Sequence, residues 1–92
     1  MALIRIHAVI SGRVQGVYFR ASTVDEARKL GLCGWVRNRN DGKVETEIQG
    51  EETEVRRLLN WLHKGPPMST VSGVISHSIA PVEGERKFVM HY

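Results

Sequence analysis

The chain has 92 residues, of which 41% are hydrophobic and 25% are charged, and its formal net charge is +3. This length allows one compact domain, which we expect to span residues 1–92, and it excludes a separate substrate domain. The composition excludes a disordered chain, and no apolar stretch approaches the roughly 20 residues that a membrane helix needs. The basic residues are scattered among acidic ones, which favours the attraction of small anions over a nucleic-acid-binding stripe.

The N-terminus and the cysteine content bear on the cellular compartment. Residues 1–5 (MALIR) lack the basic region, apolar run and cleavage site of a secretory signal, so we expect the mature chain to begin here. Cys33 is the one cysteine and therefore has no partner for an intramolecular disulfide. Small domains without disulfides are typical of reducing compartments. We therefore expect a cytoplasmic protein and, by default, a monomer.

The first third of the chain predicts a strand, a loop and a helix. Apolar and polar residues alternate over residues 3–10, as in a half-buried strand. Residues 11–17 are rich in glycine and predict a shaped loop. Apolar residues then recur at helical spacing, which predicts a helix over residues 21–30 with Ser22 or Thr23 as its N-cap.

The middle of the chain predicts an antiparallel hairpin. Residues 33–39 and 43–49 are strand-like runs joined by Asn-Asp-Gly at residues 40–42. Asp-Gly is a strong hairpin signal because both residues tolerate positive φ. We therefore assign Asp41 to turn chemistry, with no role as an acid or a metal ligand.

The last third predicts a helix and two further strands. An apolar stripe at positions i, i+3, i+4 and i+7 lies between Gly50 and Gly65 and predicts an amphipathic helix. Residues 70–79 and 87–91 then form two extended segments with weaker alternation.

The order of these elements predicts an α+β fold of the split βαβ, or ferredoxin-like, type (βαββαβ plus a short C-terminal strand). We expect an antiparallel sheet with both helices on one face. A right-handed crossover makes the first two strands parallel, with the third strand between them. Their ends then lie about 9 to 10 Å apart, which leaves room for a phosphoryl group and one water. The loop at residues 12–19 and Asn38 are therefore predicted neighbours.

The loop at residues 12–20 (GRVQGVYFR) carries the clearest chemical signal in the chain. Its glycines allow successive backbone N–H groups to turn inward as an anion-binding nest, and a helix N-terminus follows. Arg20 adds a planar fork that can bind two phosphate oxygens. A tight connection followed by a solvated arginine would carry the same residue types. The Walker and G-x-G-x-x-G patterns of nucleotide sites are absent.

Residues 12–20 resemble the acylphosphatase signature G-x-V-Q-G-V-x-[FY]-R at every fixed position, and GWVRNRNDGKVE at residues 34–45 resembles the second block of that family. The similarity covers nearly the whole chain and is loose over residues 68–82. It implies a hydrolase that cleaves acyl phosphates without a metal or an organic cofactor. In such an enzyme Arg20 binds the phosphate and Asn38 positions the attacking water. The expected phosphate-binding residues are Gln15, Gly16, Val17, Tyr18, Phe19 and Arg20.

Other functions remain open from the sequence. The chain could be a non-catalytic anion- or RNA-binding module on the same fold, with Trp35 on the open side of the sheet, although the basic-aromatic pattern of such RNA-binding domains is absent. It could also be an acylphosphatase-like part of a larger carbamoyl-transfer protein. The histidines lack the spacing of a zinc site, and we interpret Cys33 as a packed thiol. We expect a small acyl phosphate as substrate, with no nucleic acid, membrane or metal partner.

Overall fold

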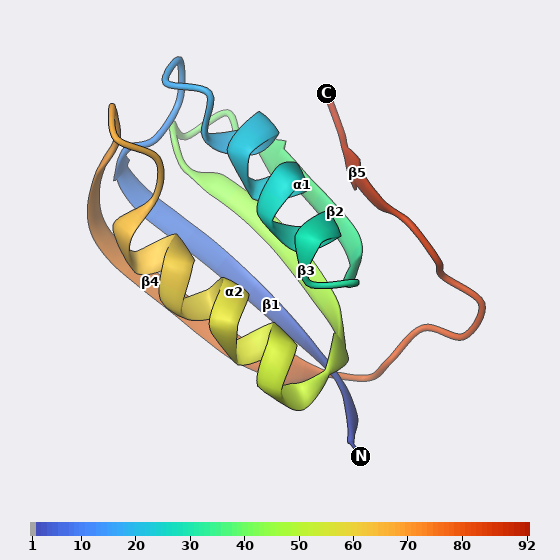
Figure 1. Ribbon diagram of the computed structural model, residues 1–92. Helices are drawn as coiled ribbons and strands as arrows, with labels where there is room; N and C mark the ends of the chain where they lie inside the picture. The colour runs from blue at the N-terminus through green and yellow to red at the C-terminus, as the bar shows by residue number, and fades with distance from the viewer. Residues whose placement is uncertain (1) are drawn as a thin grey trace.

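The computed structural model describes residues 2–92, and Figure 1 shows its strands and helices in chain order. The predicted order of elements is confirmed. The elements are β1 (Leu3–Arg13), α1 (Phe19–Lys29), β2 (Cys33–Asn38), β3 (Val44–Glu51), α2 (Glu52–Lys64), β4 (Thr70–Ile79) and β5 (Phe88–Met90).

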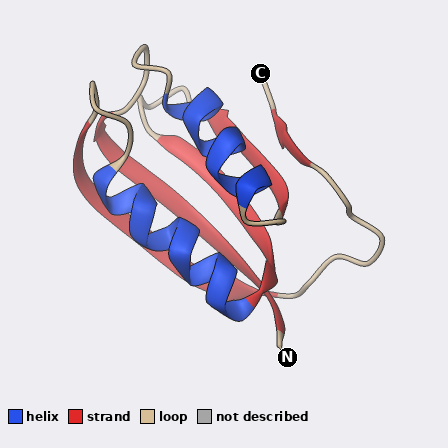
Figure 2. Cartoon of the chain, in the orientation of Figure 1, coloured by secondary structure: helices blue, strands red, loops and turns tan. Residues whose placement is uncertain are grey.

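The strands form one sheet in the order β4-β1-β3-β2-β5. The four neighbouring strands from β4 to β2 pair antiparallel, with β3 between β1 and β2 as predicted. β5 pairs in parallel with β2, so the sheet as a whole is mixed. Both helices cover the same face, as Figure 2 shows. The ferredoxin-like fold predicted from the sequence is thus confirmed.

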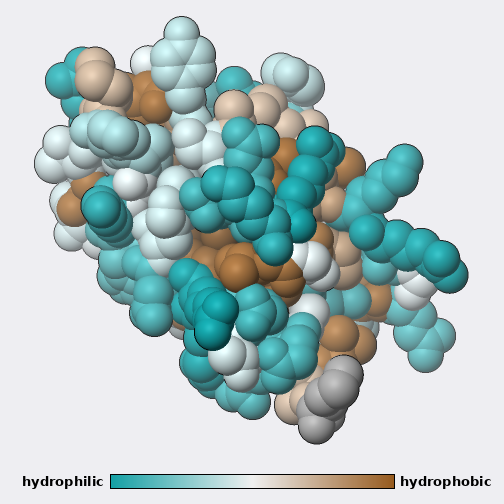
Figure 3. Space-filling model, in the orientation of Figure 1, coloured by the Kyte–Doolittle hydropathy of each residue, from teal (hydrophilic) through white to brown (hydrophobic). Residues whose placement is uncertain are grey.

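The core fills the space between the helices and the sheet. The inward residues of β1 are buried, and α2 buries Val55, Leu58 and Leu62 completely. Each such side chain contributes roughly 1.5 to 3 kcal/mol when it leaves water, so this stripe holds α2 on the sheet. The opposite side of each helix is polar, and the face seen in Figure 3 is mostly hydrophilic with small apolar areas. Among the described residues, no helix is long and apolar enough to cross a membrane.

β1 extends three residues beyond the predicted end at residue 10. Its pairing shifts register between Ser11 and Gly12 and then continues along β4 as far as Arg13. At Gly12 φ is 120°, and a Cβ there would lie 2.2 Å from the carbonyl oxygen of Thr70. Only glycine fits this bulge, and the bulge directs the chain into the loop that follows.

α1 begins at Phe19, two residues before the predicted start. Its N-cap is Tyr18, in the left-handed region at φ 62°, and no side chain caps the helix. The hydroxyl of Thr23 donates to the Phe19 carbonyl oxygen inside the helix, so the prediction of Ser22 or Thr23 as the cap is wrong. The serine and threonine do not indicate the cap here because the N–H groups at the start of α1 have no side-chain acceptor.

A buried arginine fastens the segment that carries the chain to β5. Arg5 is 2% exposed, and its guanidinium lies 2.7 Å from a carboxylate oxygen of Glu47 and 2.7 Å from one of Glu85. It also donates to the side chain of Gln49 at 3.0 Å. Burial lowers the pKa of Arg5, but the hydrogen bonds to Glu85 and Glu47 outweigh it, and the pKa is raised overall. The ion pairs therefore hold the 80–87 segment against the sheet and help direct β5 to the edge of β2.

Candidate active site

A hollow of about 360 Å³ lies where the loop after β1 meets the end of β2. The order of the strands brings these segments together because the parallel strands β1 and β2 end at the same edge of the sheet, and in Figure 1 this edge also carries the C-terminus. The lining residues come from the loop, the first turn of α1, the end of β2 and β5. They are Val14, Gly16, Tyr18, Phe19, Arg20, Ala21, Asn38 and Met90.

The structure brings most of the predicted site residues together. Arg20 and Asn38, which are 18 positions apart in sequence, line the same hollow, as do Gly16, Tyr18 and Phe19. Gln15 and Val17 do not line it. The side chain of Val17 packs into the core, and that of Gln15 turns to the β2–β3 hairpin. The predicted contact of these two residues with phosphate is through their backbone N–H groups.

Unpaired backbone donors gather at this end of α1. None of the N–H groups of residues 15–21 donates a hydrogen bond to another described residue, and the first such bond of the helix runs from Ser22 N to the Tyr18 carbonyl oxygen. The first turn of α1 contains no acidic residue. The bare donors and the positive end of the helix dipole therefore suit an anion.

Two left-handed residues shape the loop that presents these donors. Gly16 has φ 73° and Tyr18 has φ 62°, and Tyr18 is the one non-glycine residue with positive φ among the described residues. A tyrosine in this conformation costs on the order of 1 kcal/mol or more, and such strain is concentrated at functional sites. Left-handed residues in a turn can direct successive N–H groups into one concavity. Tyr18 is 81% exposed.

The side chain of Arg20 is one of those that line the hollow. It is half-buried and donates one hydrogen bond of 3.3 Å to the carbonyl oxygen of His91. The central carbon of its guanidinium lies 5.2 Å from the centre of the Tyr92 ring. It forms no ion pair with a carboxylate in the described part of the chain. Since a guanidinium has five N–H donors, most of the donors of Arg20 are free to bind an anion.

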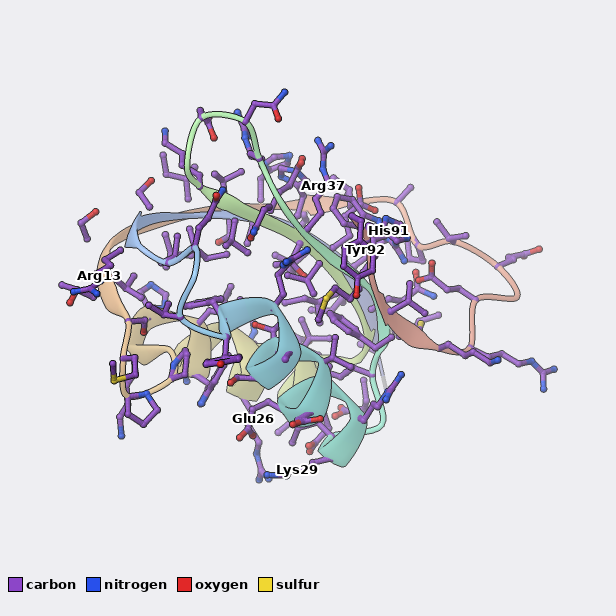
Figure 4. All side chains as sticks on the ribbon, turned by 90° about the horizontal axis from the view of Figure 1, so that it is seen from above. Arg13, Glu26, Lys29, Arg37, His91 and Tyr92 are labelled. Carbon is purple, nitrogen blue, oxygen red and sulfur yellow. The ribbon has the colours of Figure 1, made fainter. Side chains whose placement is uncertain are left out.

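The chain end contributes to the site, which sequence reasoning missed. Met90 lines the hollow, and His91 and Tyr92 contact Arg20. Figure 4 shows His91 and Tyr92 close together at this end of the molecule. No signal in the sequence points to this contact because it depends on β5 pairing with β2, and the edge that a short C-terminal strand joins is a tertiary choice.

Asn38 lines the hollow from the end of β2. It is the last residue of β2, pairs with Val44 of β3 and is half-buried. Its carboxamide forms no side-chain hydrogen bond within residues 2–92. An amide placed in this way can donate to and accept from a water molecule.

No carboxylate, imidazole or thiol lines the hollow as a general acid or base. Its ionisable lining residues are Arg20 and Tyr18, and no aspartate, glutamate, histidine or cysteine lines it. Over residues 2–92 no group of three His, Cys, Asp or Glu residues could hold a metal ion. Cys33 is a free, buried thiol. Burial and the nearby Glu85 carboxylate raise the pKa of Cys33, so it stays protonated and packed.

Comparison with known proteins decides the family. The sequence profile of the family described as Acylphosphatase matches residues 6–90. The chain belongs to the acylphosphatase family. An acylphosphatase of Pseudomonas paraeruginosa (strain DSM 24068 / PA7) is 50% identical over 90 residues, which cover 98% of each chain. The resemblance of residues 12–20 and 34–45 to acylphosphatases is therefore confirmed.

Solved acylphosphatase structures share the fold. A structure from Coxiella burnetii superposes with a TM-score of 0.91 and 40% identity, covering 97% of this chain and 93% of the other. A crystal structure from Bacillus subtilis gives a TM-score of 0.92 and 35% identity, covering 97% and 99%. Together with the family match, these relatives confirm the predicted enzyme, an acylphosphatase.

Proposed function

We propose that the hollow hydrolyses acyl phosphates, which are mixed anhydrides of a carboxylic acid and phosphate, to a carboxylate and inorganic phosphate. Arg20 and the backbone amides of residues 15–20 hold the phosphoryl group, and Asn38 positions the attacking water. The observation that carries this proposal is the meeting of Arg20, Asn38 and a run of unpaired amides in one hollow.

Binding of the phosphoryl group rests on a fixed charge and fixed dipoles. The guanidinium binds two phosphoryl oxygens side by side, and the bare N–H groups and the helix dipole act on the same oxygens. As the bond to the leaving group breaks, charge redistributes over these oxygens, and donors that are already oriented stabilise it without reorganisation. The free donors of the loop support this role because they have no protein acceptor to give up.

The nucleophile is a water held by the Asn38 carboxamide. The loop follows the end of β1 and Asn38 ends β2, and β3 lies between those two strands. Two strand spacings correspond to about 9 to 10 Å, enough for a phosphoryl group and a water in line with the leaving oxygen. Positioning of this kind converts an encounter in solution into a reaction within one complex.

The leaving group explains why the site needs no acid or base of its own. The water oxygen bonds to phosphorus, the phosphorus–acyl oxygen bond breaks, and its electron pair departs with the carboxylate, which is stable without protonation. The proton of the water passes to a phosphoryl oxygen, so the products are a carboxylate and inorganic phosphate. The absence of a carboxylate, imidazole or thiol among the residues that line the hollow supports this route.

We also propose that the enzyme acts as a single-domain cytoplasmic monomer. Cys33 is buried as a free thiol, which suits a reducing compartment.

A substrate panel tests the proposal. Purified enzyme is assayed for phosphate release from benzoyl, acetyl and carbamoyl phosphate, from a phosphomonoester and from ATP, with and without a chelator. We expect turnover of the acyl phosphates in the presence of chelator and none of the other substrates. Equal turnover of the phosphomonoester would contradict the proposal, as would activity that the chelator abolishes and a metal restores. Phosphate binding without turnover would favour the non-catalytic anion-binding module.

The RNA-binding alternative gains no support from the surface. The ring of Trp35 is stacked on that of His91, with centroids 5.5 Å apart and planes 8° apart, and the guanidinium of Arg37 lies 5.9 Å from it. Stacking on an RNA base needs an uncovered aromatic face. Trp35 is therefore a packing residue of the β2–β5 edge.

A further inference from the structure

The side chain of Gln15 forms hydrogen bonds to residues outside the phosphate-binding loop. Its Nε2 donates to the carbonyl oxygen of Arg39 at 2.7 Å and to that of Lys43 at 2.9 Å. A carboxamide nitrogen carries two hydrogens, so both donors of Gln15 are used. Gln15 therefore bonds the loop to the turn between β2 and β3.

The two acceptors lie at the two ends of the turn, one directly after β2 and one directly before β3. Arg39 follows Asn38 in the chain, and Lys43 precedes Val44, which is the cross-strand partner of Asn38. The N–H of Arg39 donates to the same Lys43 carbonyl oxygen at 2.8 Å. Gln15 therefore binds the hairpin one residue beyond the cross-strand pair of Asn38 and Val44.

No other hydrogen bond in the described chain joins the loop, residues 14–18, to the hairpin residues 38–44. The pairing of β1 with β3 ends at Ile10 and Val44, and β1 continues beyond this point along β4 alone. The loop and Asn38 therefore approach each other from segments that the sheet no longer couples. The carboxamide of Gln15 supplies the missing connection.

We propose that Gln15 is a positioning residue, whose side chain sets the distance between the phosphate-binding amides and the water held by Asn38. The inference rests on the proposed function of this site. A displacement of about 1 Å between a bound group and its nucleophile costs on the order of 100-fold in rate. Val14, Val17 and Phe19 pack into the core, so the loop amides and Arg20 keep their own arrangement when the connection to the hairpin is lost.

Two substitutions remove the connection in different ways. Gln15→Met keeps the length of the side chain but removes both donors, and Gln15→Glu presents acceptor oxygens to two carbonyl oxygens. We expect kcat for benzoyl phosphate to fall by about 10- to 100-fold in both variants. The inhibition constant of inorganic phosphate should stay within about threefold of the original value, because the cradle itself is intact.

A double-mutant cycle with Asn38→Ala identifies the residue through which Gln15 acts. If Gln15 serves to place Asn38 against the phosphate, Gln15→Met should have little further effect on kcat once the Asn38 carboxamide is gone. An equal fall of kcat in both backgrounds would overturn the proposal. A rise in the phosphate inhibition constant that matches the fall in kcat would also overturn it, since Gln15 would then shape the cradle.

Thr46→Val is the matched control for a general loss of stability. Thr46 is buried, and its hydroxyl donates to the Trp35 carbonyl oxygen at 2.7 Å, within the same pair of strands. This variant loses a side-chain-to-backbone hydrogen bond without touching the loop. We expect its melting temperature to fall at least as far as that of Gln15→Met while kcat stays within about twofold of the original value. Equal losses of kcat in the two variants would overturn the proposal.

A measurement that needs no turnover separates this proposal from the proposed function. The side-chain amide of Asn38 gives its own NMR signal, and we expect Gln15→Met to shift it and Thr46→Val to leave it nearly unchanged. An unchanged Asn38 signal in Gln15→Met would overturn the positioning role. A shifted signal in an enzyme that does not hydrolyse acyl phosphates would refute the proposed function and leave the structural connection established.

Discussion

Substitution of Arg20 by alanine gives the sharpest separation between catalysis and stability. In the folded protein the guanidinium makes one hydrogen bond of 3.3 Å and one contact with the Tyr92 ring at 5.2 Å, and it pairs with no carboxylate of residues 2–92. An exposed contact of either kind contributes about 0.5 to 1 kcal/mol. We therefore expect Arg20→Ala to lower the free energy of unfolding by roughly 1 kcal/mol, or the melting temperature by about 4 to 8 °C.

The expected effect on catalysis is much larger. Arg20 is the one cationic residue that lines the hollow, so its removal takes charge stabilisation from the reacting phosphoryl group. We expect kcat to fall by about 10³-fold or more, which corresponds to roughly 4 kcal/mol of transition-state stabilisation. Arg20→Lys should not restore the rate because an ammonium group cannot bind two oxygens in one plane.

The assay follows benzoyl phosphate hydrolysis in the presence of chelator, alongside thermal unfolding. Arg13→Ala is the matched control, since Arg13 is an exposed arginine of the preceding strand that points away from His91 and Tyr92 in Figure 4. Its removal changes the net charge equally and should leave kcat within about threefold of the original value. Hydrolysis near the original rate in Arg20→Ala or Arg20→Lys would refute the assigned role, as would an equal loss in Arg13→Ala.

Three further predictions concern the nucleophile, the bulge in β1 and the charges on the open face of the sheet. Asn38→Ala should lower kcat by at least about 10²-fold and leave the competitive inhibition constant of phosphate nearly unchanged, and a parallel loss of phosphate affinity would contradict a role limited to the water. Gly12→Ala places a Cβ 2.2 Å from Thr70 O and should cost at least about 3 kcal/mol by chemical denaturation. Gly16→Ala, with nothing within 4 Å, should cost only about 1 kcal/mol, and equal losses would refute the steric argument. Burial raises the pKa of Glu45, but hydrogen bonds from His7 and Arg37 outweigh it and hold the pKa below its usual range. The stabilisation by ionised Glu45 is therefore complete above its unfolded pKa and is lost as the pH falls through its folded pKa. Glu45→Gln should lower stability by about 1 kcal/mol at pH 7 and flatten the decline of stability as the pH falls below the unfolded pKa. Parallel curves for the two proteins would contradict that assignment.

Local sequence signals predicted the elements whose formation depends on near neighbours. The Asp-Gly turn between β2 and β3 is present, with Gly42 at φ 88°. Val55, Leu58 and Leu62 of the α2 stripe are buried as its spacing predicts, and Leu59 is half-buried. These predictions succeed because a turn type or an amphipathic face depends on residues a few positions apart.

The start of α1 shows where local signals fail. Ser and Thr near a predicted helix start normally indicate a cap, yet this helix begins at Phe19 with its first N–H groups unpaired. A capping side chain would occupy the donors that an anion needs. Local stability and the candidate function therefore favour different residues at this helix end.

The sequence by itself determined the family motifs, the order of the elements and, through the crossover rule, the approach of Arg20 to Asn38. Only the tertiary structure decided that β5 joins the edge of β2 and brings Tyr92 to Arg20, and that Gln15 bonds to the β2–β3 turn. The motifs and the element order arise from short-range residue spacing and backbone sterics, which act within each segment of the chain. The other contacts join residues 24 to 72 positions apart, and they form only after hydrophobic burial and strand pairing have chosen one arrangement of the whole sheet.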